Sequence, residues 1–292
     1  MNLTKKPFVV LEIGCNHKGD ISIAESLIKE TATANVAAVK FQKRNIFECL
    51  TEAERKAPHP NPQNSYGNTY GEHRAFLEFS MDQHRHLKEY AESLGLIYSA
   101  SVFDLTSAKE ITSLNPQYIK VASAQNTNTL LLDWLCDNYF GEIQVSLGMT
   151  TEKEEERLIS LFQMHNRLKD LTLLACTSCY PVESKDACIL EVKRLSQLYE
   201  KDIKRIGISG HYIPIEIDIA AYALGAEVIE RHFTHNKYWK GTDHIASLDI
   251  EDVKRLCNGL EEVHKAMTYK ESRIIPAELE SRNKMKYGRG KK

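Results

Sequence analysis

Two histidines stand where two consecutive strands are expected to end, His211 in the motif SGH and His232 in the motif ERH. Neighbouring parallel strands lie about 4.8 Å apart, so the two imidazoles could share one divalent metal ion. Asp243 follows in the run KGTDH and would reach the same rim, where it could orient a substrate hydroxyl or complete a metal shell. The pattern predicts a metal centre, and the alternative is two structural core histidines and a turn aspartate.

Lysines and hydroxyl groups are expected at the same end of other strands. Lys40 and Gln42 share one strand face because side chains alternate along a strand, and Lys120 belongs to another strand. The serines expected beside them are Ser101, Ser123, Ser146 and Ser209. Two ammonium groups and several hydroxyls at one mouth suit a small, multiply charged anion such as a phosphate or a carboxylate. A single strand-end lysine is usually solvated, so the prediction rests on the convergence of several strands.

Glu12 precedes Gly14 by two residues and is expected on the inner face of the first strand. A carboxylate in a mouth that contains lysines is either an ion-pair partner or a general base and hydroxyl anchor. The sequence leaves both roles open.

The elements that would position these residues alternate along the chain. Short, β-rich apolar runs lie at 8–14, 36–42, 96–103, 117–123, 142–148, 171–178, 205–211 and 227–233. Each is followed by a stretch with helical spacing, at 21–34, 81–94, 106–114, 128–138, 152–167, 184–200, 213–224 and 249–267. Eight such units predict a (β/α)8 TIM barrel over 1–268, with its chemistry at the carboxyl ends of the strands. The alternative is an open doubly wound sheet, but the first turn, GCNHKGD, matches neither GxGxxG nor GxxxxGK[ST].

Two segments fall outside this repeat. Residues 45–79 form a long excursion after the second strand, which we interpret as a cover over the barrel mouth because long loops in compact domains are usually functional or disordered. Residues 269–292 form a basic tail, with six Lys or Arg and no acidic residue after Ser281, and the tail is expected to be solvated.

The overall composition narrows the class of function. With 292 residues, 38 Lys plus Arg and 40 Asp plus Glu, the net charge of −2 provides no basic excess for binding nucleic acid or anionic lipid. No window has the roughly 18 apolar residues of a membrane span, and the start MNLTKKPFVVLEIG has no signal-peptide pattern, so a cytoplasmic protein is expected. Seven cysteines suit reduced thiols, and the CxxC of Cys176 and Cys179 is interpreted as structural because it has no thioredoxin-like context.

The motifs EIGCNHKGD, AAVKFQKR, IKVAS, SLGMT, ISGH and VIERHFT…WKGTDHIASLD follow one another across residues 8–250. Together they resemble the sialic acid synthase family, the N-acetylneuraminate synthases. The resemblance implies a (β/α)8 barrel and an enzyme that condenses phosphoenolpyruvate with an aldehyde sugar, either N-acetylmannosamine or a related 2,4-diacetamido or other hexose. The products would be a 2-keto-3-deoxy nonulosonic acid and phosphate.

Carried over motif by motif, the resemblance assigns roles to individual residues. It implies phosphoenolpyruvate binding for Lys40, Ser101, Lys120, Ser123, Ser146 and Ser209. It implies contacts to the sugar for Glu12, Gln42, Tyr180 and Asp243. His211 and His232 would be the two protein ligands of Mn²⁺, or of Mg²⁺ or Co²⁺, which would polarise the aldehyde as a Lewis acid. The catalytic candidates are Glu12, Lys40, Lys120 and Asp243, with carbon–oxygen cleavage releasing the phosphate.

Three departures from the family pattern bear on the substrate. Gln125 stands where these synthases usually have Glu, and Ser178 where they usually have Asn. Both are candidate substrate contacts, and each change could cost about 1–3 kcal/mol per unsatisfied buried partner. The chain ends at Lys292, without the small antifreeze-like domain whose arginine reaches the sugar site of a dimer partner. In a homodimer, Arg282 or Arg289 of the tail could replace that arginine, as could the excursion 45–79.

Two alternatives come from other classes of protein. A metal-dependent hydrolase or aldolase barrel would use the two histidines and Asp243 but would leave Lys40 and Lys120 without a role. A non-catalytic paralogue that binds a sugar acid would have no physical need for so many polar residues at one mouth. The synthase is therefore the hypothesis that the sequence favours.

Overall fold

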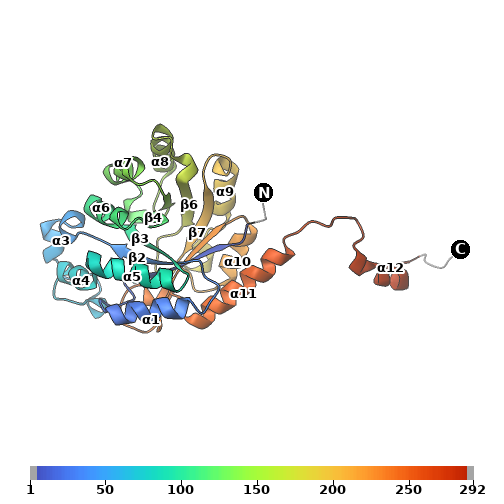
Figure 1. Ribbon diagram of the computed structural model, residues 1–292, viewed down its shortest axis with the longest axis horizontal. Coiled ribbons are helices and arrows are strands. Elements are labelled where there is room, and N and C mark those ends of the chain that lie inside the picture. The colour runs from blue at the N-terminus through green and yellow to red at the C-terminus, as the bar shows by residue number, and fades with distance from the viewer. Residues whose placement is uncertain (1–4, 288–292) are drawn as a thin grey trace.

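Eight parallel strands close into a barrel in chain order in the computed structural model, which describes residues 5–287 (Figure 1). The strands are β1 (Phe8–Gly14), β2 (Ala38–Lys43), β3 (Ile97–Val102), β4 (Tyr118–Val121), β5 (Glu142–Ser146), β6 (Leu171–Cys176), β7 (Arg205–Gly210) and β8 (Val228–His232). The closing pair is β1 with β8, in a register that sets Glu12 opposite His232. The predicted (β/α)8 barrel is confirmed.

A layer of helices surrounds the barrel (Figure 1). The helices that follow the eight strands are α1 (Ile21–Thr31), α5 (Met81–Ser93), α6 (Leu105–Ser113), α7 (Thr129–Asn138), α8 (Glu152–Met164), α9 (Leu190–Tyr199), α10 (Glu216–Ala223) and α11 (Ile250–Ala266). Side-chain caps start several of them: the Asp20 carboxylate accepts from two backbone N–H groups of α1, and Thr151 and Glu154 form a capping box at α8. On α11 the buried side chains recur at helical spacing, at Val253, Leu256, Cys257 and Leu260.

Three of the helices that are shorter than expected have a local reason for it. The stretch 184–200 is helical only in a 3-10 turn at 184–186 and in α9, because Cys188 between them has a positive φ of 47°. Asn166, at φ 56°, lies just past the end of α8. Pro214 disfavours helical backbone at Ile213, so α10 begins at Glu216 rather than at 213.

Strand parity divides the barrel interior into two layers of different character. The lower layer is apolar and consists of Val10, Ala38, Tyr118, Leu174 and Val228. Two residues further along the same strands, and therefore on the same inner face, the upper layer carries Glu12, Lys40, Lys120, Cys176 and Glu230. The barrel is thus filled by an apolar layer beneath polar and charged side chains that face the carboxyl ends.

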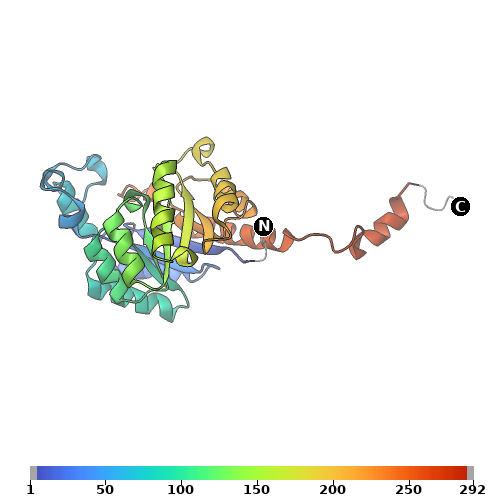
Figure 2. The same ribbon diagram turned by 90° about the horizontal axis from the view of Figure 1, so that it is seen from above.

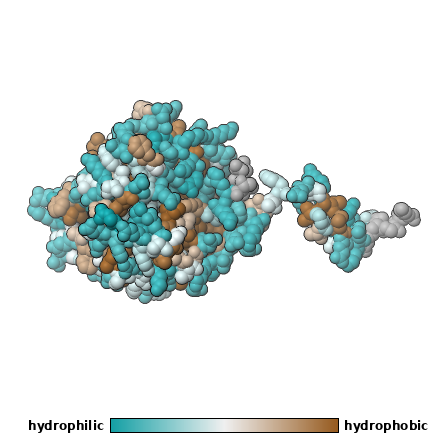
Figure 3. All heavy atoms as spheres, in the orientation of Figure 1, coloured by the Kyte–Doolittle hydropathy of each residue, from teal (hydrophilic) through white to brown (hydrophobic). Residues whose placement is uncertain are grey.

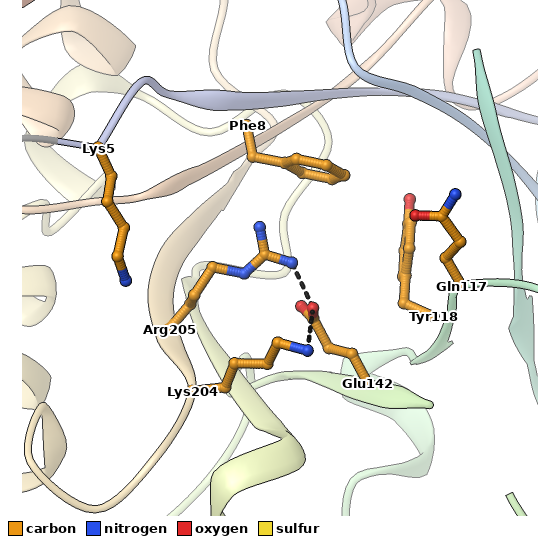
Figure 4. Close-up of a pocket in the computed structure, with 7 residues that line it drawn as sticks. All are labelled: Lys5, Phe8, Gln117, Tyr118, Glu142, Lys204 and Arg205. Carbon is orange, nitrogen blue, oxygen red and sulfur yellow. Dashed lines mark hydrogen bonds and ion pairs between the residues drawn. The ribbon is translucent and has the colours of Figure 1, made fainter. Parts of the chain in front are cut away.

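The amino-terminal end of the barrel holds a smaller cavity of about 390 Å³ (Figure 4). Its charged residues are Lys5, Glu142, Lys204 and Arg205. Glu142 pairs with Arg205 and lies 3.3 Å from the Lys204 ammonium, so its carboxylate compensates two of these cations. Ion pairs that join strand ends at this face are expected to stabilise the barrel rather than to carry its chemistry.

The excursion after β2 lies at the opposite, carboxyl end and protrudes from one side of the barrel (Figure 2). It contains α2 (Ile46–Cys49), α3 (Glu52–Lys56), a 3-10 turn (Pro62–Asn64) and α4 (Tyr70–Leu77). The Tyr66 hydroxyl donates to the Lys240 carbonyl at 2.5 Å, and the Gly241 N–H donates to Asn64 Oδ1 at 3.3 Å. These bonds connect the excursion to the loop between β8 and α11, across the mouth that it was expected to cover.

Beyond α11 the chain leaves the barrel and forms a short 3-10 turn (Pro276–Glu278) and α12 (Leu279–Met285) (Figure 1). Apolar side chains gather on this tail in Figure 3, and Ile274, Leu279 and Met285 are exposed. Arg282 lies on α12, whereas Arg289 lies outside the described residues, so their role toward a partner subunit stays a prediction. Among residues 5–287, no helix has the length and apolar character to cross a bilayer.

Candidate active site

A cavity of about 890 Å³ opens at the carboxyl ends of the strands, and every strand contributes to its wall. Its lining includes all but one of the predicted site residues: Glu12, Lys40, Gln42, Ser101, Lys120, Ser123, Ser146, Ser178, Tyr180, Ser209, His211, His232 and Asp243. Gln125 is the exception, because β4 ends at Val121 and a 3-10 turn carries Gln125 away from the cavity. The Gln125 amide oxygen instead accepts from Asn128 at 2.9 Å.

Two buried lysines lie at the floor of this cavity, in the upper layer of the barrel. Lys40 is 1 % exposed, pairs with the Glu12 carboxylate and donates to Ser101 Oγ at 2.7 Å. Lys120 is 3 % exposed, and its ammonium lies 3.0 Å from Glu230 Oε1. The strand register explains the first of these pairs, because Glu12 and Lys40 lie opposite each other on β1 and β2.

Glu230 connects the two lysines. Its Oε2 lies 3.7 Å from Lys40 Nζ, and its Oε1 also accepts from Ser209 Oγ at 2.9 Å. Burial would raise the pKa of Glu230, but the Lys120 and Lys40 ammonium groups outweigh burial and hold this pKa well below its usual range. For Lys40, burial is the dominant effect and lowers the pKa of the ammonium to about 7, although the Glu230 carboxylate opposes that shift. Glu230 lies two residues before His232 and so shares its strand face, but sequence reasoning assigned it no role.

Several buried polar atoms in the cavity wall accept or donate no hydrogen bond among the described residues. They are Ser146 Oγ, Glu12 Oε1 and Glu230 Oε2. A buried polar group without a hydrogen bond is costly, so such atoms at a cavity wall are available to a ligand. The Ser123 hydroxyl, by contrast, accepts from the Gly148 N–H at 3.1 Å, close to Ser178 and Cys176.

The two histidines lie side by side, with ring centroids 5.4 Å apart. His211 Nδ1 lies 3.2 Å from the Thr177 carbonyl, which can only accept, so Nδ1 carries the proton and Nε2 keeps its lone pair. Burial lowers the pKa of His211 to about 3 and also lowers the pKa of His232. Both imidazoles are therefore neutral near pH 7, which is the form that binds a metal ion.

The surroundings of the histidine pair fit two protein ligands rather than three. His232 Nδ1 is buried without a hydrogen-bond partner and lies 3.9 Å from Asp243 Oδ2. The described part of the chain contains no group of three or more His, Cys, Asp or Glu that could hold a metal ion, and a role of Asp243 in a metal shell stays a prediction. The Tyr180 ring contacts both imidazoles, at 4.2 Å from His211 and 6.1 Å from His232.

The outer wall of the cavity contains cationic and aromatic residues that sequence reasoning missed. Arg44 lies just past the end of β2, two residues after Gln42. Its guanidinium donates to Gln42 Oε1 at 2.5 Å. Strand parity could have indicated Arg44. The excursion contributes Tyr66, His73 and Arg74, which no local pattern marks because only the folded loop brings them to the mouth.

The comparisons with known proteins agree with this geometry. The model of the NeuB family matches residues 27–272. N-acetylneuraminate-9-phosphate synthase of Mus musculus is 33% identical over 278 residues, which make up 95% of this chain and 76% of that protein. N,N'-diacetyllegionaminic acid synthase of Campylobacter jejuni is 31% identical over 264 residues, or 90% of this chain and 78% of that protein. The crystal structure of an N-acetylneuraminic acid synthetase from Leptospira borgpetersenii, in complex with citrate, has a TM-score of 0.81 at 27% identity and covers 97% of this chain and 94% of that one.

The predicted resemblance to sialic acid synthases is thus confirmed, together with the barrel that it implied. The relatives are synthases of the type that condenses phosphoenolpyruvate with a sugar to make nonulosonic acids, and enzymes of this type generally depend on a metal ion. With the family model over most of its length and the synthase residues gathered in one cavity, this chain belongs to the NeuB family and is an enzyme of the sialic acid synthase type.

Proposed function

We propose that this chain condenses phosphoenolpyruvate with an aldehyde sugar to give a 2-keto-3-deoxy nonulosonic acid and phosphate. The observation that carries the proposal is that two buried lysines and two neutral histidines line the same cavity. A hydrolase or aldolase that used only the histidines and Asp243 would leave two buried ammonium groups without a function.

The lysine end of the cavity is suited to phosphoenolpyruvate. Lys40 and Lys120 supply charge-assisted donors, and the unpartnered Ser146 hydroxyl is free to donate to an anionic oxygen. Ser101 and Ser209 hold the ammonium and carboxylate groups in place rather than facing open space. Holding the enol phosphate in one pose beside the acceptor is the entropic part of catalysis.

The histidine end is suited to the aldehyde. A divalent cation held by His211 and His232 would act as a Lewis acid toward the aldehyde oxygen, and we propose Mn²⁺, with Mg²⁺ or Co²⁺ as the other candidates. Asp243 and Gln42 would accept and donate hydrogen bonds at the sugar hydroxyls, and the Tyr180 ring would cover the histidine pair from solvent. Glu12 pairs with Lys40, so of its two predicted roles the structure favours the ion pair, while its unpartnered Oε1 could also anchor a hydroxyl.

The reaction consists of attack by C3 of phosphoenolpyruvate on the aldehyde carbon, addition of water at C2 and departure of phosphate. The decisive assay uses phosphoenolpyruvate labelled with ¹⁸O in the bridging position, Mn²⁺ and a panel of aldehyde sugars, including N-acetylmannosamine and 2,4-diacetamido hexoses. We expect phosphate release only with an aldehyde, equimolar 2-keto acid and the label in the phosphate. Phosphate release without an aldehyde, or cleavage of the sugar itself, would favour a hydrolase or an aldolase.

The metal role has its own readout. The His211→Ala variant should lose Mn²⁺ binding measured by electron paramagnetic resonance, and its residual activity should not respond to a chelator. The matched control is His165→Ala, because His165 lies on the outer surface between Asp133 and Asp137. Full activity of His211→Ala in the presence of chelator would contradict the proposed metal site.

A further inference from the structure

The orientation of the Gln42 amide in the cavity wall is fixed by its neighbours. The Arg44 guanidinium donates to Gln42 Oε1 at 2.5 Å, and the Cys15 thiol donates to the same oxygen at 3.6 Å. A guanidinium has donors only, so the atom of Gln42 that faces it must be the oxygen. The amide nitrogen of Gln42 therefore points the other way, and it has no hydrogen-bond partner among residues 5–287.

This amide nitrogen lies near a carboxylate oxygen that is also without a partner. A Cβ atom built on Gly14 would lie 2.9 Å from Gln42 Nε2 and 2.9 Å from Glu12 Oε1, so the two atoms border the same small space. Glu12 Oε1 is buried and unpartnered, because the other carboxylate oxygen pairs with Lys40. A donor and an acceptor that border one space suit a sugar hydroxyl, which can accept one hydrogen bond and donate another.

Arg44 is itself held in place before any ligand binds. Its side chain is 10 % exposed, and the carbon at the centre of its guanidinium lies 3.6 Å from the centre of the Phe103 ring. Its Nη1 lies 3.5 Å from Glu78 Oε1, and its backbone N–H donates to Glu78 Oε2 at 2.8 Å. A planar guanidinium that is stacked and paired in this way has little rotational freedom left, so its direction toward Gln42 is set in advance.

The contact with Glu78 also connects the Gln42 amide to the excursion. Arg44 directly precedes the excursion 45–79, and Glu78 lies near its end, immediately after α4. The ion pair between them therefore joins the two ends of the excursion at the point where the guanidinium reaches Gln42. The same arginine thus holds the base of the excursion and one side chain of the cavity wall.

We propose that Arg44 is a positioning residue of the acceptor site, which turns the Gln42 amide so that its nitrogen donates to an oxygen of the aldehyde sugar. The inference rests on the proposed function and adds that the contact of Gln42 with the sugar is a donor whose direction Arg44 sets. Without the guanidinium, the amide oxygen loses its charge-assisted donor and the amide can turn over. The oxygen would then face the space beside Glu12 Oε1, where two acceptors leave no donor for a sugar oxygen.

The test measures KM for phosphoenolpyruvate and KM for the aldehyde sugar separately, with the best acceptor of the panel and with Mn²⁺. Assays at pH 6 keep Lys40 protonated in every variant, because its pKa is about 7 and the charge of Arg44 contributes to lowering it. Arg44→Met removes the donor and keeps an unbranched side chain beside Phe103. We expect KM for the sugar to rise about threefold to tenfold, as for one lost hydrogen bond, while kcat and KM for phosphoenolpyruvate change by less than about twofold. Arg44→Lys retains one charged donor and should recover part of the loss.

A double variant distinguishes positioning from direct contact with the sugar. Gln42→Leu removes the amide and should raise KM for the sugar about tenfold. If Arg44 acts through Gln42, adding Arg44→Met to Gln42→Leu should change this KM by less than about 1.5-fold, because both substitutions remove the same interaction. Gln42→Glu keeps an oxygen for Arg44 but replaces the donor with an acceptor, so it should raise KM for the sugar about tenfold or more.

Lys43→Met is the matched control. The Lys43 ammonium is about as buried as the Arg44 guanidinium and lies 4.0 Å from Glu78 and 3.5 Å from Glu110. Lys43 is adjacent to Gln42 on β2, so its side chain points to the opposite face of the strand. Lys43→Met therefore removes a cation beside the same carboxylate without touching the Gln42 amide, and it should leave both KM values unchanged.

Each result bears on one of the two proposals. An unchanged KM for the sugar in Arg44→Met, additive losses in the double variant or an equal loss in Lys43→Met would overturn the positioning role while leaving the synthase in place. If Arg44→Met does not fold, Arg44→Lys alone and combined with Gln42→Leu provides the same comparison. Absence of 2-keto acid with every aldehyde in the wild-type protein would instead overturn the proposed function, and this inference with it.

Discussion

The buried pair of Arg231 and Asp218 should contribute more to stability than any other single contact near the histidines. Both side chains are 0 % exposed. The Arg231 guanidinium pairs with Asp218 Oδ2 and also donates to the Tyr212 carbonyl, while the Tyr212 hydroxyl donates to Asp218 Oδ1 at 2.6 Å. Because Arg231 precedes His232 and Tyr212 follows His211, this network joins the segments that carry the two proposed metal ligands.

Asp218→Asn removes the negative charge without changing the volume of the side chain. The asparagine oxygen can still accept from Arg231, and its amide can donate to the Tyr212 hydroxyl, so the main loss is the counter-charge of a fully buried guanidinium. Leaving one partner of a buried ion pair uncompensated costs about 3–5 kcal/mol. With a urea m-value of about 3 kcal/mol/M for a domain of this size, the unfolding midpoint should fall by about 1–1.7 M.

The assay is urea unfolding followed by far-UV circular dichroism and by the fluorescence of Trp134 and Trp239, whose coincidence tests two-state behaviour. Tyr212→Phe is the matched control because it removes one hydrogen bond to the carboxylate but keeps the ion pair, at a cost of about 1.5–3 kcal/mol. Adding Arg231→Met to Asp218→Asn should recover part of the loss, since no buried charge remains. A midpoint for Asp218→Asn at or above that of Tyr212→Phe, or a double variant less stable than the single one, would refute the electrostatic explanation.

Two further predictions concern the phosphoenolpyruvate end of the cavity. Because burial lowers the pKa of Lys40 to about 7, its ammonium is lost as the pH rises through 7, and kcat/KM for phosphoenolpyruvate should fall about tenfold per unit above that value. Lys40→Arg stays charged and should flatten this limb between pH 6 and 9, so an unchanged limb in that variant would exclude Lys40 as its source. In Gly148→Ala, the new Cβ would lie 2.1 Å from Ser178 Oγ and 2.7 Å from Ser123 Oγ. Both hydroxyls must move, so KM for phosphoenolpyruvate should rise about tenfold in Gly148→Ala. Adding Ser178→Ala should restore KM because it removes the closer hydroxyl. An unchanged KM in Gly148→Ala would show that these hydroxyls do not contact the substrate.

Much of the fold was predictable because its signals are local. The apolar run FVVLEIG predicts a strand at 8–14, and β1 spans Phe8–Gly14. Alternation along the strands also places Lys40, Lys120 and the histidines at one mouth, because the inward face of a barrel strand is fixed by parity. Helix ends were less predictable: Cys188 adopts left-handed backbone, which its residue type does not indicate, whereas Asn166 adopts it as a residue type that favours it.

The site was predictable where it depends on strands and unpredictable where it depends on loops or on charge balance. Gln125 was assigned by position after a strand motif, but the 3-10 turn at Ser123–Gln125 takes its side chain out of the cavity. Arg74 lies on a helix of the excursion, about thirty residues from the nearest strand-end motif, and reaches the mouth only through tertiary contacts such as that of Tyr66 with Lys240. Neither the strand pattern nor the loops of this chain indicate whether it forms a homodimer, so homodimer formation stays a prediction.

The charge balance of the upper layer bears on how the two substrates bind. Glu12 and Glu230 allow Lys40 and Lys120 to stay charged inside the barrel, because an uncompensated buried ammonium would cost several kcal/mol. Below pH 7, where Lys40 is protonated, the four groups are together electrically neutral, so phosphoenolpyruvate is not attracted there by an excess of positive charge. Its affinity must come from directed donors, such as the lysine protons and the open Ser146 hydroxyl, and from the cation at the histidines. Directed donors depend less on ionic strength than a long-range excess of charge does, so KM for phosphoenolpyruvate should change little as the salt concentration rises.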